Sequence, residues 1–99
     1  MTNEEKVKAI YPWINPEERV TVHFLDEPDL NAEVTSCNAE LVDLSIETRV
    51  PHIRQRISVA LRRTEVSEDL SHYTRDPERP LKHRRLMLVI DDTRPPIVY

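Results

Sequence analysis

The stretch NAELVDLSIET, residues 38–48, decides the expected fold, because it has the alternation of a β-strand with two different faces. In an extended segment successive side chains point to opposite sides, so Val42, Leu44 and Ile46 form one apolar face. Asp43 and Ser45 then stand together on the opposite face. Two polar groups there could receive a ligand or cap the turn that follows, and the habits of Asp and Ser favour the cap.

Other segments of the chain also have strand character, and we expect strands at residues 19–25, 32–36 and 85–91. The first places Val20, Val22 and Phe24 on one side. The second either pairs with residues 39–46 or continues into them as one bent strand. The third is apolar on both faces, which predicts a central strand.

Residues 51–64 are the ambiguous part of the sequence. Ile57, Val59 and Leu61 alternate as in a strand, whereas Ile53, Ile57 and Leu61 also fit one face of a helix. The β-branched residues favour the strand. We therefore predict that this segment joins the sheet, with Ile57, Val59 and Leu61 inward.

The overall prediction is a mainly β fold, a small antiparallel β-barrel with a short N-terminal helix. Thr2 and Glu5 have the spacing of a capping box at the start of that helix, and Pro12 limits it to about two turns. A helix at residues 51–64 would instead make the fold α+β. The length of 99 residues fits a single domain spanning residues 1–99.

Composition excludes several kinds of protein. The chain has no glycine, so glycine-rich phosphate loops are excluded, and turns with positive φ should use asparagine or aspartate. The four histidines lack metal-ligand spacing, and no local motif supplies an activated nucleophile, so we expect no metal, no cofactor and no enzyme. The single cysteine, the absence of an apolar run of about 18 residues and the acidic N-terminus predict a cytoplasmic protein without a membrane segment.

Charge is divided unevenly along the chain. Residues 1–48 carry 3 Lys and Arg against 11 Asp and Glu, and residues 49–99 carry 11 against 7. Residues 67–83 are polar, contain two prolines and are expected to form a long excursion between two strands. Their aromatic and cationic side chains predict a surface for an acidic protein partner, formed by His72, Tyr73, Arg75, Arg79 and Lys82. Nucleic acid is a less favoured partner because aromatic residues are few.

Two short segments resemble the motifs of PilZ domains, which are small antiparallel β-barrels that bind the bacterial messenger cyclic di-GMP. That family has Arg-x-x-x-Arg just before a strand and Asp/Asn-x-Ser-x-x-Gly at the end of a later strand. Arg19 matches the second arginine, while Asn15 stands in place of the first. Asp43 and Ser45 match the second motif, while Thr48 replaces its glycine.

The resemblance implies a bacterial signalling domain with Arg19, Asp43 and Ser45 as ligand-binding residues. One arginine clamps phosphate less well than two, and the side chain of Thr48 obstructs close backbone approach. We therefore expect cyclic di-GMP binding to be absent or weak, and the domain to act through protein contacts. The alternative is a small α+β subunit or adaptor of a larger complex, whose basic second half binds an acidic partner or nucleic acid.

Overall fold

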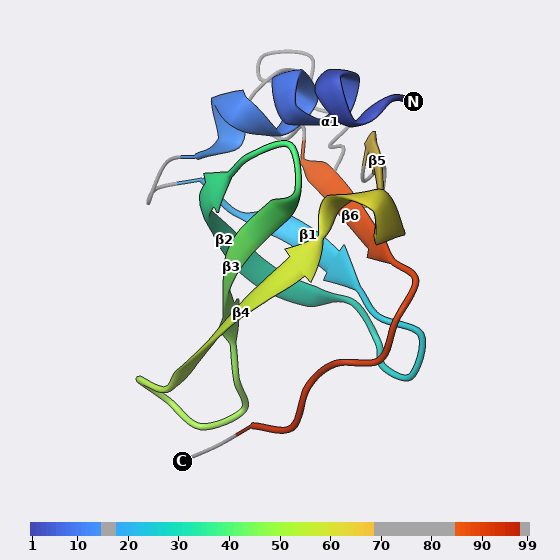
Figure 1. The fold of residues 1–99 in the computed structure, drawn as a ribbon. Helices are drawn as coiled ribbons and strands as arrows, with labels where there is room; N and C mark the ends of the chain where they lie inside the picture. The colour runs from blue at the N-terminus through green and yellow to red at the C-terminus, as the bar shows by residue number, and fades with distance from the viewer. Residues whose placement is uncertain (15–17, 69–84, 98–99) are drawn as a thin grey trace, which may run out of the picture.

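The computed structural model describes residues 1–14, 18–68 and 85–97, and these form a mainly β fold with one short α-helix (Figure 1). Helix α1 (Asn3–Ile10) and the 3-10 helix η1 (Tyr11–Trp13) come first. Six strands and a second 3-10 helix follow: β1 (Val20–His23), β2 (Leu30–Cys37), β3 (Leu41–Glu47), β4 (Arg54–Ala60), η2 (Leu61–Arg63), β5 (Thr64–Glu68) and β6 (Leu86–Ile90). The predicted mainly β class is confirmed.

All six strands belong to one mixed sheet with the order β4-β3-β2-β1-β6-β5. Strands β1 to β4 form an antiparallel meander, and β5 pairs antiparallel with β6. Strand β6, however, runs parallel to β1, so the prediction of a wholly antiparallel sheet is wrong at this pair. Strand β6 lies between β1 and β5, so it is an internal strand as predicted, one place from the edge of the sheet. Its two apolar faces reflect partial cover on the outer side, where Met87 and Val89 are half-buried.

The sheet is not closed into a barrel by hydrogen bonds among the described residues, but its two edges approach each other at one end. Edge strands β4 and β5 are separated in the chain only by the three residues of η2. Consecutive Cα atoms are about 3.8 Å apart, so this link holds the end of β4 close to the start of β5. Helix α1 contacts η2 and β5 at that end. The buried Lys6 Nζ donates a hydrogen bond to the Leu61 carbonyl oxygen at 3.1 Å.

The hydrophobic core lies on the concave face of the curled sheet and follows the predicted alternation. Val42, Leu44 and Ile46 are buried, as predicted for β3. The other buried apolar residues are Ile10, Val20, Val22, Phe24, Ala32, Val34, Val59, Leu61, Leu86, Leu88 and Ile90. Apolar residues at every second position of the strands therefore account for most of this core.

Strand β4 settles the ambiguity of residues 51–64, because the segment is a strand followed by a single 3-10 turn. The alternative of a helix there, and with it an α+β fold, is wrong. Val59 and Leu61 are buried as predicted, although Leu61 belongs to η2, and Ile57 is only partly buried against the core. Ile57 is less covered because β4 is an edge strand.

The structure also tests the predictions for the start of the N-terminal helix, for the turns and for the long excursion. Thr2 and Glu5 form the complete capping box of α1, with hydrogen bonds of 3.2 Å in both directions. In the described residues the only positive φ, 69°, is at His52 in the β3–β4 turn, so a histidine takes the role expected of asparagine or aspartate. The predicted excursion begins later than expected, since Ser67 is still part of β5, and most of it lies outside the described residues.

Candidate functional site

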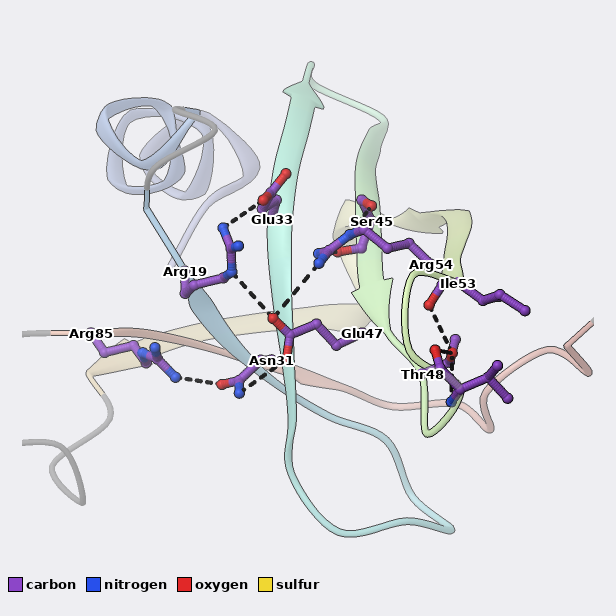
Figure 2. Close-up of polar contacts among 10 residues, drawn as sticks. Arg19, Asn31, Glu33, Ser45, Glu47, Thr48, Ile53, Arg54 and Arg85 are labelled. Atoms are coloured by element: carbon purple, nitrogen blue, oxygen red, sulfur yellow. Dashed lines mark hydrogen bonds and ion pairs between the residues drawn. The ribbon is translucent and has the colours of Figure 1, made fainter.

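The outer face of the sheet carries a group of charged and polar side chains from four successive strands (Figure 2). Arg19 immediately precedes β1, and the β1–β2 register brings it beside Glu33. Glu33 is paired across the sheet with Ser45 of β3. Glu47 of β3 is paired with Arg54 of β4. Strand alternation therefore gathers these five residues on the side opposite to the core.

Arg19 is held by two carboxylates. Its Nη1 lies 2.5 Å from Oε1 of Glu33, and its Nε lies 3.3 Å from Oε1 of Glu47. The same Glu47 oxygen is 3.6 Å from Nη1 of Arg54, so Glu47 stands between two guanidinium groups. The Arg19 side chain is only 34% exposed. This residue, expected to bind a ligand, is thus part of an internal ion-pair network.

Ser45 is also engaged within the network. Arg54 Nε donates to the Ser45 hydroxyl at 2.7 Å, and Arg54 Nη2 donates to the Ser45 carbonyl oxygen at 2.6 Å. Ser45 is buried despite its position on the outer face. The Arg54 side chain satisfies it, so the expectation that Ser45 caps a turn is wrong.

Asp43 shares the outer face of β3 with Ser45 but has different partners. The register places Asp43 between Ser36 of β2 and Ser58 of β4. Ser36 Oγ donates to one carboxylate oxygen at 2.5 Å, and Ser58 Oγ donates to the other. These hydrogen bonds, from Ser36 first and then Ser58, hold the pKa of Asp43 below its usual range because they favour the charged form. Asp43 therefore bonds across strands and does not cap a turn.

The network extends to the second half of the chain through Asn31. Its amide nitrogen lies 3.4 Å from Oε2 of Glu47, and its amide oxygen accepts from Arg85 Nη1 at 2.5 Å (Figure 2). At the end of β3, the Thr48 hydroxyl donates to the Ile53 carbonyl oxygen at 2.7 Å. Where the PilZ motif has glycine, this chain thus has a side chain that ties the β3–β4 turn together.

No protein-family model, curated protein or solved structure matches this chain significantly. The resemblance to PilZ domains therefore stays a prediction. Within residues 1–14, 18–68 and 85–97, no group of three or more His, Cys, Asp or Glu is placed to hold a metal ion. No helix in the same part of the chain is long and apolar enough to cross a membrane.

The structure places the predicted site residues differently from one another. Arg19 and Ser45 belong to one network, while Asp43 is bonded to a neighbouring pair of serines. Sequence reasoning missed Glu33, Glu47 and Arg54. Their positions at alternate places in expected strands were the available signal, but the cross-strand register was needed to see that they meet. The predicted partner-binding residues lie outside the described residues: His72, Tyr73, Arg75, Arg79 and Lys82.

A cleft of about 260 Å³ lies where the sheet remains open, beside the end of β4. One side is formed by β4 and η2, and the other by the end of β6 and the segment that follows it. Its lining residues are Phe24, Ser58, Val59, Ala60, Arg62, Arg63, Ile90, Asp92, Thr93 and Pro95. Arg63 and Asp92 form an exposed ion pair of 3.2 Å across it. The cleft thus combines apolar residues with two arginines, one aspartate and two hydroxyl groups.

Proposed function

We propose that this chain is a small non-catalytic interaction domain, PilZ-like in its motifs, which acts through protein contacts. The observation that carries this proposal is the engagement of Arg19 by Glu33 and Glu47. In a PilZ-like site this arginine would receive a phosphate. Here two carboxylates already occupy the guanidinium and add negative charge where the phosphate would approach.

The other two motif residues support the same conclusion. The Ser45 hydroxyl accepts a hydrogen bond from Arg54, and both Asp43 oxygens accept from serines. A ligand would have to break these bonds before making its own, and each exchange would gain little. The face is therefore well suited to rigidify the sheet and poorly suited to bind a nucleotide. A barrel-like sheet, drawn together where η2 links the two edge strands and open along the outer edge of β4, belongs to this proposal too.

The proposed partner is an acidic protein, and the proposed setting is the bacterial cytoplasm. Both follow from the resemblance and from the charge of residues 49–99. The proposed contact residues include Arg75, Arg79 and Lys82, whose cationic side chains would steer an acidic partner toward the domain.

Two experiments test this function. In calorimetry, cyclic di-GMP should give no saturable heat at about 100 μM. The Glu33→Gln/Glu47→Gln variant, which removes two negative charges beside Arg19, should bind it more tightly than the wild type. Low-micromolar binding by the wild type, abolished by Arg19→Ala, would contradict the proposal. Separately, immobilised wild-type chain should capture protein partners from a lysate of the source organism, and the variant Arg75→Ala/Arg79→Ala/Lys82→Ala should lose them. A nucleic-acid surface would instead show steep salt dependence.

A further inference from the structure

The outer edge of β4 carries main-chain groups that have no β-ladder partner among residues 1–14, 18–68 and 85–97. Within the described residues β4 pairs only with β3. Leu61 N donates a hydrogen bond to Glu40 O at 2.9 Å, and these two residues continue the β3–β4 register. This bond shows which residue pairs of the two strands are hydrogen-bonded. Because bonded and non-bonded pairs alternate in an antiparallel ladder, every second residue of β4 directs its N–H and C=O away from β3. These outward residues are Arg54, Arg56, Ser58 and Ala60.

The segment after β6 runs beside this edge but does not pair with it. Gln55 Nε2 donates to the carbonyl oxygens of Pro95 and Pro96, at 2.8 and 3.3 Å. Neither proline has an N–H, so this segment cannot complete a β-ladder there. No backbone hydrogen bond joins residues 91–97 to β4. The buried Gln55 Oε1 likewise has no hydrogen-bond partner in the described part of the chain. The edge is partly covered, but no neighbouring strand in the described part of the chain bonds to its main-chain groups.

The cleft beside the second half of β4 offers room for another extended chain. It is lined by Ser58 and Ala60 of the edge strand. The buried side chains of Phe24, Val59 and Ile90 form its floor, and the exposed Pro95 completes its apolar part. Alternate side chains of an added strand would face this apolar surface, and its backbone would meet the outward groups of β4. A strand added here would also extend the sheet across its open side.

Charge selects the kind of segment that fits. Arg62 lines the cleft, and Arg56 lies on β4 two residues before the lining Ser58. Both arginines are exposed, and neither takes part in an ion pair within the described residues. Arg63 at the same rim is paired with Asp92. The other edge strand, β5, carries Glu65 and Glu68 and is contacted by α1. An acidic strand therefore suits the edge of β4 and is disfavoured at β5.

We propose that the outer edge of β4 binds an extended acidic segment of a partner protein by β-strand addition. This inference rests on the proposed function and adds a second contact surface, with its partner chemistry, to the cationic residues proposed above. The backbone supplies most of the contact, and Arg56 and Arg62 select acidic side chains.

A peptide titration followed by nuclear magnetic resonance on the isotope-labelled full chain tests the proposal. The probe is an acetylated, amidated hexapeptide of alternating Glu and Val, and the control replaces each Glu with Lys. The Glu peptide should give saturable shifts that are largest at the amides of Arg56 and Ser58. The Lys peptide should bind at least about tenfold more weakly, which corresponds to about 1.4 kcal/mol.

Two matched changes separate the backbone from the charge. Arg56→Ala removes the side chain, whereas Arg56→Pro also removes the outward N–H without touching the β3–β4 bonds. The proline variant should bind at least about fivefold more weakly than the alanine variant. The peptide can be N-methylated at its odd or at its even residues, and one of these two patterns should abolish binding. This measurement uses the wild-type chain, so it tests the proposal even if Arg56→Pro fails to fold.

Several results would overturn the proposal. In the titration, these are the absence of a saturable shift at millimolar peptide, or shifts centred on β5. Equal binding by the alanine and proline variants, or a dimer of the free chain formed through β4, would also contradict it. Separate results decide whether the proposed interaction function itself is correct. If captured partners are retained equally by wild type and Arg56→Pro, the β4 edge is wrong while the interaction function stands. If wild type captures no protein partner, the interaction function itself fails.

Discussion

The ion pair between Arg19 and Glu33 should make a measurable contribution to stability, which distinguishes a structural arginine from one kept for a ligand. The double-mutant cycle uses Arg19→Ala and Glu33→Gln. The two side chains are 34% and 21% exposed and 2.5 Å apart, so solvent screens the pair only partly. Exposed pairs usually contribute 0 to about 1 kcal/mol, and we expect a coupling energy near the upper end, about 1 kcal/mol.

Urea denaturation at 25 °C gives the free energy of unfolding of each variant, and repeating it in 1 M NaCl should reduce the coupling. The matched control is Arg63 and Asp92, an ion pair of 3.2 Å whose side chains are 52% and 55% exposed. The cycle with Arg63→Ala and Asp92→Asn should give a coupling near zero. A coupling for Arg19 and Glu33 no larger than the control, or one insensitive to salt, would refute the assignment of Arg19 to the internal network.

Three further outcomes are expected. The Asp43 carboxyl should titrate below its usual pKa in carbon-detected NMR, and this pKa should rise in Ser58→Ala. Because the pKa of Asp43 is lower in the folded state, its contribution to stability is present above the unfolded-state pKa. That contribution is lost as pH falls through the folded-state pKa. Lys6→Met should lower the free energy of unfolding by about 1–3 kcal/mol in urea titrations, because the Leu61 carbonyl loses its buried donor; an unchanged value would show that solvent replaces it. His52→Gly should raise stability by up to about 1 kcal/mol, since φ there is 69°, and a lower thermal midpoint would contradict this reasoning.

Local periodicity was sufficient to predict most strands of this fold. Val42, Leu44 and Ile46 alternate cleanly, and each is buried. Strand β4 was harder to recognise because Gln55 stands at an inward position, which weakens the apolar pattern. The parallel pairing of β1 with β6 has no local signal at all, because it joins strands from opposite ends of the chain.

The candidate site was predicted less well than the fold, because its contacts depend on register. Asp43 was recognised as an outward polar residue, but its partners come from two other strands. The β2–β3 register shifts between Val34 and Ser36, and this irregularity brings Ser36 opposite Asp43. No spacing within one segment reveals such a shift. Similarly, Arg19 matched a motif, but the two carboxylates that neutralise it lie on β2 and β3.

The position of β6 between β1 and β5 also determines when the domain can be completed during synthesis. A ribosome delivers the β1–β4 meander first and the last strand only after residue 85. Until then the edge of β1 that will receive β6 has no partner, and the apolar residues Val20 and Val22 lack part of their cover. Such late, long-range pairing is slow and leaves the nascent chain open to aggregation. A message truncated before codon 86 should therefore yield an insoluble product, even though it encodes five of the six strands that the structure describes.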